Sequence, residues 1–206
     1  MCRYTGPKNR IARKFGANIF GRLRNPLLHK PHPPGMHGMK RKKTSEFGLQ
    51  LAEKQKLRAV YGMLADKQLL KYFKEALRRE GNTPHTIIEL LESRLDNLVY
   101  RMGFATSIFH AQQLVAHGHI LVNGKKLDIR SYSVQPGSTI AVKEKSKNNV
   151  LIKQALAMTH RDIPEFLSVD KDKMSGQMIS APHWDQVSLP LPINVALVCE
   201  FLAHSH

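Results

Sequence analysis

The dipeptide Asn123-Gly124 constrains this chain more than any other local feature, because it stands between two short runs of strand-forming residues. Both residues accept the positive φ angles of a type I′ turn, and this pair between β-prone runs is the strongest short-range signal for a two-residue hairpin. We therefore expect residues 119–122 to pair with residues 125–127. This register puts Ile120 opposite Leu127 and two lysines beside the turn.

Two short helices are expected before the hairpin. Apolar residues recur at helical spacing over 95–102 and again over 108–115, and Gly103 and Gly118 follow these two runs. Glycine ends a helix readily because it adopts a positive φ without strain. Each apolar run is therefore expected to form one short helix that stops at its glycine.

A second turn completes this unit. Residues Gln135-Pro136-Gly137 form a typical turn sequence, and the β-prone run over 139–142 follows them as a closing strand. The sequence from 94 to 142 therefore predicts a compact helix-helix-hairpin unit with basic residues around one turn.

Hydrophobic periodicity predicts further regular structure on either side of this unit. The expected helices cover residues 46–61, 64–81, 83–92, 146–158 and 193–202, and the expected short strands cover 166–169 and 177–180. The buried stripe of the second of these helices is expected to contain Leu69, Phe73, Ala76 and Leu77. We expect the last helix to pack on residues 46–92, because both have apolar faces.

Charge is distributed unevenly along the chain. The 206 residues carry a net charge of +16. Residues 1–45 hold 12 Lys and Arg and no acidic residue, whereas residues 159–206 hold 3 basic and 6 acidic residues. Glycines and prolines break residues 1–43, where the pattern admits only a short helix over 8–14. A basic segment of this kind is typical of an arm that becomes ordered on a nucleic acid.

Several other classes of protein are disfavoured. No apolar run approaches the ~18 residues of a membrane-spanning helix, and no secretory signal is visible. Cys2 and Cys199 are too few for a disulfide framework and are expected to be reduced thiols in a cytosol-like compartment. No nucleophile-base pair or cluster of acids indicates an enzyme. Asp96 is expected to fix Arg94 and Arg101 or to cap a turn, rather than to act in catalysis.

A resemblance to a known family covers almost the whole chain. Residues 94–142 resemble the RNA-binding module named after small-subunit ribosomal protein four, and the residues before them resemble the same ribosomal family in its bacterial or plastid form. The module motifs are Arg94-Leu95-Asp96-Asn97, Tyr100-Arg101-Met102-Gly103-Phe104, Gln113-Leu114-Val115 and Val122-Asn123-Gly124. The other motifs include Tyr4-Thr5-Gly6-Pro7-Lys8, Pro34-Gly35-Met36-His37-Gly38, Phe47-Gly48-Leu49-Gln50-Leu51, Tyr61-Gly62 and Gly81-Asn82-Thr83.

The resemblance implies an α+β fold: a mostly helical, discontinuous body with an inserted helix-helix-hairpin RNA-binding module and an extended basic N-terminal arm. The expected parts are the arm (1–45), the helical body (46–93), the module (94–158) and a C-terminal return segment (159–206) that packs on the body.

The function implied by the resemblance is that of a structural constituent of the small ribosomal subunit. Such a protein binds the 5′ region of the small-subunit rRNA, nucleates assembly of the body of the subunit and contributes to translational accuracy with the neighbouring fifth protein. It lies close to mRNA where the message enters, and it represses its own operon by binding mRNA. The implied location is the ribosome, in the cytoplasm or, for an organellar protein, in the plastid stroma.

The expected RNA-binding residues combine basic positions of the arm, the body and the module. They are Arg3, Lys8, Arg10, Arg13, Lys14, Arg22, Arg24, Lys40, Arg41, Lys42, Lys43, Lys54, Arg58, Arg101, Gln113, His117, Lys125, Lys126 and Arg130. Many relatives carry arginines on the second module helix, where this chain has Ile108 and Gln112. Gln112, Gln113 and His117 are expected to face away from the core.

No cofactor or metal is expected. Many relatives hold zinc with four cysteines near the N-terminus, but residues 9–13 of this chain read Asn-Arg-Ile-Ala-Arg. Two alternatives to a ribosomal constituent use the same module: an RNA-modifying enzyme and a ribosome-rescue factor. The first needs a separate catalytic domain, and relatives of the second are mostly the module with a tail.

Overall fold

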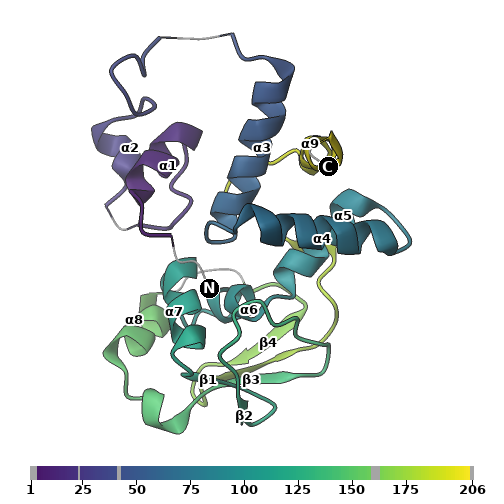
Figure 1. Cartoon of the computed structure of the whole chain (residues 1–206). Helices are drawn as coiled ribbons and strands as arrows, with labels where there is room; N and C mark the ends of the chain where they lie inside the picture. The colour runs from purple at the N-terminus through teal and green to yellow at the C-terminus, as the bar shows by residue number, and fades with distance from the viewer. Residues whose placement is uncertain (1–3, 23, 41–42, 159–162, 205–206) are drawn as a thin grey trace. The chain divides into compact units, whose positions relative to one another are not determined.

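The structure is a computed structural model that describes residues 4–22, 24–40, 43–158 and 163–204. The chain divides into two compact units (Figure 1). One unit consists of Met1–Ile87 with Leu189–His206, and the other of Ile88–Ser188. Helix α5 (Thr83–Glu92) carries the chain from the first unit into the second.

The hairpin of the second unit forms as the sequence predicts. Strands β1 (Ile120–Val122) and β2 (Lys125–Lys126) pair antiparallel, and the Leu127 amide donates to the Ile120 carbonyl at 3.3 Å. Between the strands, Asn123 has a φ of 50° and Gly124 a φ of 76°. The Asn123 side chain also accepts a hydrogen bond from the Thr139 amide at 2.8 Å, which ties the turn to the next strand.

The two short helices before the hairpin are also confirmed. They are α6 (Leu95–Arg101) and α7 (Ile108–Ala116). The Ser107 hydroxyl caps α7 by accepting from the His110 amide at 3.3 Å. Gly103 (φ 82°) and Gly118 (φ 70°) take the left-handed conformation just after the two helices.

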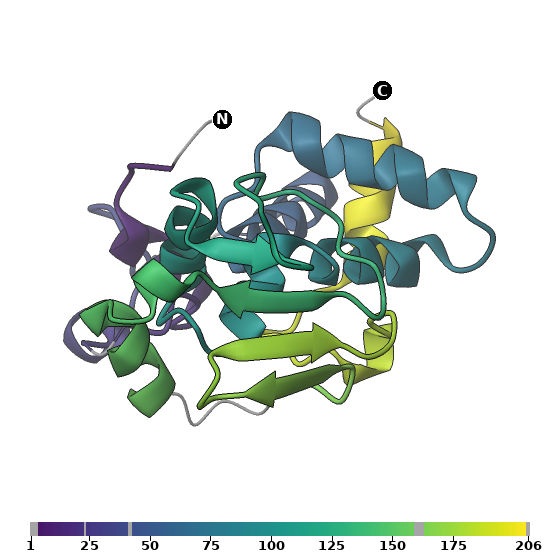
Figure 2. The same ribbon diagram turned by 90° about the horizontal axis from the view of Figure 1, so that it is seen from below.

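The sheet of the second unit is larger than the hairpin and its closing strand. Strand β3 (Thr139–Val142) pairs with β5 (Ser175–Met178), which pairs with β4 (Leu167–Asp170), in the order β2-β1-β3-β5-β4. Every pairing is antiparallel, and Figure 2 shows the longer strands side by side. Helix α8 (Val150–Met158) and the 3-10 turns η1 (Glu144–Ser146) and η2 (Trp184–Gln186) complete the unit.

The role expected for residues 159–206 is therefore wrong for their first part. Strands β4 and β5 form close to the predicted positions, but they extend the sheet of the module instead of packing on the helical body. Without them β3 would present an unpaired edge. Gly176 allows the close pairing, because a Cβ at this position would lie 2.8 Å from the Ser168 carbonyl oxygen.

One hydrophobic core joins the helices and the sheet of this unit. Side chains from α6, α7 and α8 meet those of the strands and of the segment before β4. The members include Leu95, Leu98, Met102, Phe104, Leu114, Val115, Ile120, Ile140, Ile152, Phe166, Leu167 and Met178. All of these residues belong to the unit of Ile88–Ser188, so this unit has a hydrophobic core of its own.

In the other unit, α3 (Glu46–Val60) is paired with α9 (Val195–His204), which also touches α4 (Asp66–Arg78). This packing confirms the position expected for the last helix. The rings of Phe47 and Phe201 lie 5.3 Å apart, and the Glu53 carboxylate accepts from the Asn194 amide at 2.9 Å. On α4, the residues Leu69, Phe73 and Ala76 are buried, but Leu77 is 58% exposed, so its assignment to the core was wrong.

The arm is more structured than its sequence pattern indicates. Helix α1 (Lys8–Phe15) matches the predicted short helix, and an additional short helix, α2 (Pro26–His29), packs near it. The Asn25 side chain caps α2 and Pro26 opens it, which is a recognisable start signal. Ala12, Ile19 and Phe20 of this segment are buried.

Candidate RNA interface

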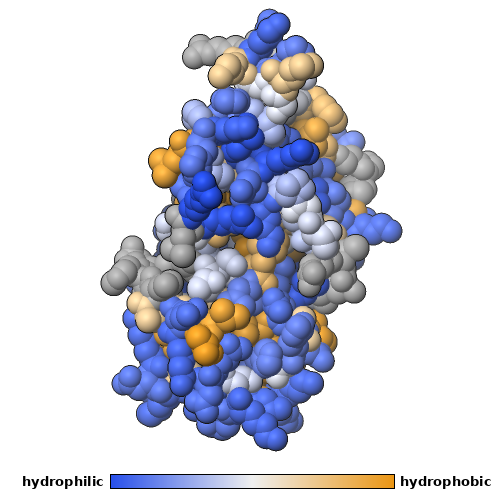
Figure 3. Space-filling view, turned by 90° about the vertical axis from the view of Figure 1, so that its left-hand side faces the viewer, coloured by the Kyte–Doolittle hydropathy of each residue, from blue (hydrophilic) through white to orange (hydrophobic). Residues whose placement is uncertain are grey.

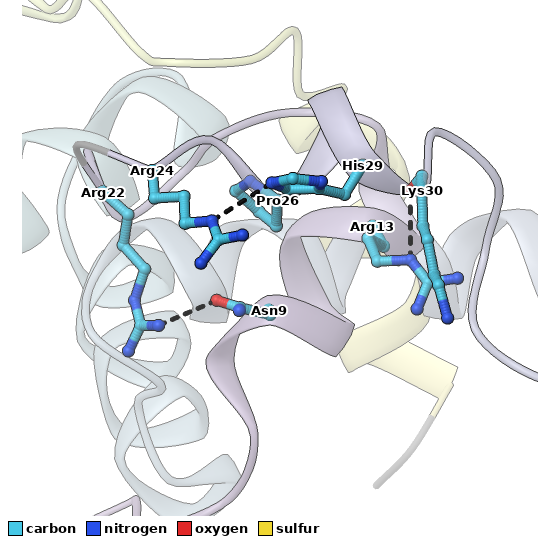
Figure 4. Close-up of a pocket in the computed structure, with 7 residues that line it drawn as sticks. All are labelled: Asn9, Arg13, Arg22, Arg24, Pro26, His29 and Lys30. Atoms are coloured by element: carbon cyan, nitrogen blue, oxygen red, sulfur yellow. Dashed lines mark hydrogen bonds between the residues drawn. The ribbon is translucent and has the colours of Figure 1, made fainter.

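The arm forms an open basic cavity between α1 and α2. The cavity has a volume of about 530 Å³ and is lined by Asn9, Arg13, Arg22, Arg24, Pro26, His29 and Lys30. Figure 4 shows how the three arginines reach it: Arg22 donates to the Asn9 side chain at 3.0 Å and Arg24 to the His29 ring at 3.1 Å. The Arg13 guanidinium lies against the chain that follows α2.

Arg13 holds the cavity together. Its Nε donates to the carbonyls of Lys30 and His32, both at 3.1 Å, and its Nη2 donates to the Pro33 carbonyl at 3.4 Å. This side chain therefore closes the segment after α2 onto α1. These three acceptors are backbone carbonyls, so these hydrogen bonds do not bring a carboxylate to the cavity.

No acidic residue lines this cavity, and none precedes Glu46 in the sequence. The amide of Asn9 and the ring of His29 orient Arg22 and Arg24 without offering a carboxylate to balance them. Planar guanidinium groups held in this way match the oxygens of a phosphate. The set of RNA-binding residues expected from the sequence did not contain Lys30 and His29. The uninterrupted basic character of residues 1–45 could have indicated both of them.

The remaining candidates of the arm that the structure describes do not line this cavity. Arg10, Lys14, Lys40 and Lys43 are exposed and Lys8 is half-buried, whereas Arg3, Arg41 and Lys42 lie outside the described residues. Figure 3 shows the face that carries the arm, and strongly hydrophilic side chains cover most of it. Exposed cations are thus a feature of the described part of the arm.

The hairpin brings a second group of candidates together. Lys125 and Lys126 are exposed on β2, and the stem of Lys126 lies directly over Gly118 at the end of α7. Gln113 and His117 are exposed on the last turn of the same helix and just after it. Nearby, burial lowers the pKa of His110, and repulsion by His119 lowers it further, which favours the neutral imidazole.

Arg130 does not belong to this group. It is only 8% exposed, and its Nη1 donates to the Gln112 side chain at 3.5 Å. Gln112 is also buried, so its expected outward orientation is wrong. Its side-chain amide donates a hydrogen bond to the Asp96 carboxylate at 3.3 Å. The side chain of Gln112 thus bridges Arg130 to a carboxylate inside the unit.

The same carboxylate holds Arg94, as the sequence predicts. The Arg94 Nε and Nη2 atoms donate to the two Asp96 oxygens at 3.0 and 2.8 Å, and both residues are almost fully buried. Arg101 has a different partner from the one expected. It forms a two-pronged ion pair with the fully buried Glu92, at 3.1 and 2.8 Å, and donates to the Ser188 carbonyl at 2.9 Å.

Lys54 and Arg58 of α3 are likewise engaged inside their own unit. The Lys54 ammonium lies 3.1 Å from Asp66 and 4.4 Å from the centre of the Phe201 ring. Arg58 pairs with Asp66 at 2.9 Å and donates to the Leu64 carbonyl at 2.6 Å. We therefore leave Lys54, Arg58, Arg101 and Arg130 out of the proposed RNA-binding set.

Two findings bear on other kinds of site. Among the described residues, no group of three or more His, Cys, Asp or Glu side chains is arranged to hold a metal ion. None of the helices in that part of the chain has the length and apolar character needed to cross a membrane.

Comparison with known proteins assigns the chain to a family. Residues 3–92 match the family described as "Ribosomal protein S4/S9 N-terminal domain", and residues 93–140 match the "S4 domain". The chain is 60% identical over 205 residues to small ribosomal subunit protein uS4 of Protochlamydia amoebophila, with 100% of each chain covered. The chain belongs to the uS4 family of small ribosomal subunit proteins. It is also 58% identical over 207 residues to the uS4 proteins of Chlamydia pneumoniae and Chlamydia trachomatis serovar D, with 99% of each chain covered.

The two matches meet between Glu92 and Ser93. The S4 domain match ends at residue 140, inside β3, whereas the sheet continues through β5 and β4. In this uS4 chain the RNA-binding module is therefore completed by strands that lie outside the matched domain.

Proposed function

We propose that this protein is a structural constituent of the small ribosomal subunit that binds rRNA directly. Membership of the uS4 family supports the ribosomal role. The observation that carries direct RNA binding is the arm cavity, where cationic side chains converge and no carboxylate balances them. A second basic surface at Lys125 and Lys126 supports a contact of the module with the same RNA.

A more specific proposal concerns the region of rRNA that the protein binds and the stage of subunit assembly at which it binds. We infer binding to the 5′ region of the small-subunit rRNA, early enough to nucleate assembly of the body of the subunit. Contacts with the neighbouring fifth protein, a role in translational accuracy and a position near incoming mRNA belong to the same proposal. Repression of its own operon would use the same basic surfaces on an mRNA that resembles the rRNA site.

Sedimentation tests the ribosomal role. The tagged protein should travel with small subunits in a gradient at moderate salt, and it should remain at the top when the particles are omitted. A protein that stays at the top in the presence of subunits would contradict the proposal.

Binding of rRNA fragments tests the contact made by the arm cavity. The double variant Arg22→Gln with Arg24→Gln should weaken binding to a 5′ fragment. If each arginine meets one phosphate, the slope of log affinity against log salt should fall by about 1.4–1.8 units. The matched control changes two exposed lysines outside the proposed surfaces, Lys145→Gln with Lys171→Gln. Equal behaviour of the two double variants would refute a role for the cavity.

A further inference from the structure

Helix α4 carries a row of cations that belongs to neither the arm nor the hairpin. The row consists of Lys67, Lys71, Lys74 and Arg78, all exposed, and we call it the α4 stripe. Steps of four, three and four residues keep these side chains on one face of the helix. At about 1.5 Å per residue the stripe is ~16 Å long. Leu69, Phe73 and Ala76 form the buried face of the same helix.

The carboxylates that could neutralise the α4 stripe are engaged elsewhere. Asp66, which begins the helix, pairs with Lys54 and Arg58 of α3 at 3.1 and 2.9 Å. Glu75 pairs with Arg79 at 3.5 Å. In the part of the chain that the structure describes, no carboxylate lies within ion-pair distance of any of the four stripe residues. The stripe therefore keeps four uncompensated positive charges along one helix face.

The surface between these cations is shallow, and its lining contains no aromatic ring. The stripe residues line a hollow of about 360 Å³ together with Leu70 and Glu75. A surface without aromatic rings offers nothing on which a base could stack. Lysine ammonium groups act as mobile point charges that suit phosphates without reading sequence.

We propose that the α4 stripe binds the sugar-phosphate backbone of RNA, as a contact separate from those of the arm cavity and the hairpin. The inference rests on the proposed function, because it takes the RNA to be the one that the protein already binds. It assigns an RNA-binding role to the helical body. Lys54 and Arg58 of the same body were left out of the RNA-binding set because they contact Asp66. An acidic protein segment is the other polyanion that such a stripe could meet, and the test below separates the two.

The test is a salt titration of binding to a small-subunit rRNA fragment from the 5′ region. Lys71→Gln with Lys74→Gln removes two charges from the middle of the stripe, and glutamine has nearly the same helix propensity as lysine. If both lysines meet phosphates, the slope of log affinity against log salt should fall by about 1.4–1.8 units. The control is Lys145→Gln with Lys171→Gln, which should leave the slope unchanged. Circular dichroism should show the same helix content in all three proteins.

Four outcomes are informative. A lower slope for the stripe variant alone supports the inference. An unchanged slope, with the wild-type protein still binding the fragment, overturns the inference and leaves the proposed function standing. An unchanged slope combined with poorer incorporation of the variant into reconstituted subunits also overturns it, in favour of a protein partner. Failure of the wild-type protein to bind the fragment at moderate salt would instead remove the proposed function itself.

Discussion

At the scale of single residues, the partners of each arginine or lysine decide whether it can meet a phosphate. Arg22 and Arg24 are oriented by neutral groups and keep their charge available. Arg101 faces a buried carboxylate, and Arg94 faces another. Basic side chains that look equivalent in a sequence therefore separate into surface cations and internal ones.

The Arg94–Asp96 pair provides a test of the role of basic side chains that face buried carboxylates. Asp96→Asn keeps the shape of the side chain but removes the carboxylate that the buried guanidinium faces. Breaking a buried ion pair in this way should lower the free energy of unfolding by about 3–5 kcal/mol. Denaturant unfolding of the purified protein measures this change.

The matched control is Glu75→Gln, which breaks the pair between Glu75 and Arg79. Both side chains are about half exposed, at 44% and 52%, and such surface pairs contribute about 0–1 kcal/mol. If Asp96→Asn costs no more than Glu75→Gln, the buried pair has no special role in stability.

Cys199 gives a prediction that depends on pH. Burial raises the pKa of this thiol to about 11, and the charge of Glu200 acts in the same direction. In a Cys2→Ser background, alkylation by iodoacetamide should therefore be slow near pH 8 and should rise about tenfold per pH unit towards pH 11, because the thiolate is the reactive form. The unfolded protein should instead reach its plateau nearer pH 9.

The same shift has a consequence for stability. The folded state binds the thiol proton more tightly than the unfolded state. The resulting contribution of Cys199 to the free energy of unfolding is therefore fully present below about pH 9 and is lost as the pH rises through about 11. A folded protein whose thiol titrates at the pH of the unfolded chain would show that Cys199 is not desolvated.

At the scale of elements, local signals predicted most of the structure. Asn123-Gly124 gave the correct hairpin register because the turn type and the side-chain alternation act over only a few residues. The joining of β5 to β3 was missed because it brings together residues about 40 apart, and no local pattern specifies the partner of a strand edge. Arg130 and Gln112 were assigned to the surface for a related reason: both are long polar residues, and only the packed structure shows that their heads meet inside.

The turn of the hairpin can be tested alone. A Cβ at Gly124 would meet no atom within 4 Å, so a side chain there is opposed only by the φ of 76°. Gly124→Val should therefore lower the free energy of unfolding by roughly 1–2 kcal/mol or more, because a β-branched residue is strained at positive φ. It should also weaken rRNA binding by displacing Lys125, while the helix content stays the same. If stability and affinity are both unchanged, Lys125 is not positioned by this turn.

At the scale of the whole molecule, affinity for RNA should be divided among separate basic surfaces. Residues 1–43 contain 12 of the 32 Lys and Arg residues. If about half of them meet phosphates, deletion of 1–43 should flatten the slope of log affinity against log salt by roughly four or five units. Discrimination between RNA sequences should suffer less, because backbone contacts carry little sequence information.

The measurement is a titration of the full-length and truncated proteins against the same rRNA fragment. The truncated protein should remain folded, since α9 packs on α3 and contacts α4 without the arm. A change of less than about one unit, with folding retained, would show that the arm contributes little to binding.

The pairing of α3 with α9 has a consequence for how the protein is made. Translation delivers α3 long before its packing partner α9, because the whole of the other unit lies between them in the chain (Figure 1). At about 5–20 residues per second, α3 waits on the order of ten seconds or more for α9, while the sheet of the module closes as soon as β5 has emerged. The unit of Ile88–Ser188 can thus mature on the nascent chain before the unit of Met1–Ile87 with Leu189–His206 does. During that interval Leu57 and Ala59, which are buried in the folded protein, are accessible on α3. A newly made chain is therefore most exposed to chaperones, and to premature aggregation, at the unit that begins first and finishes last.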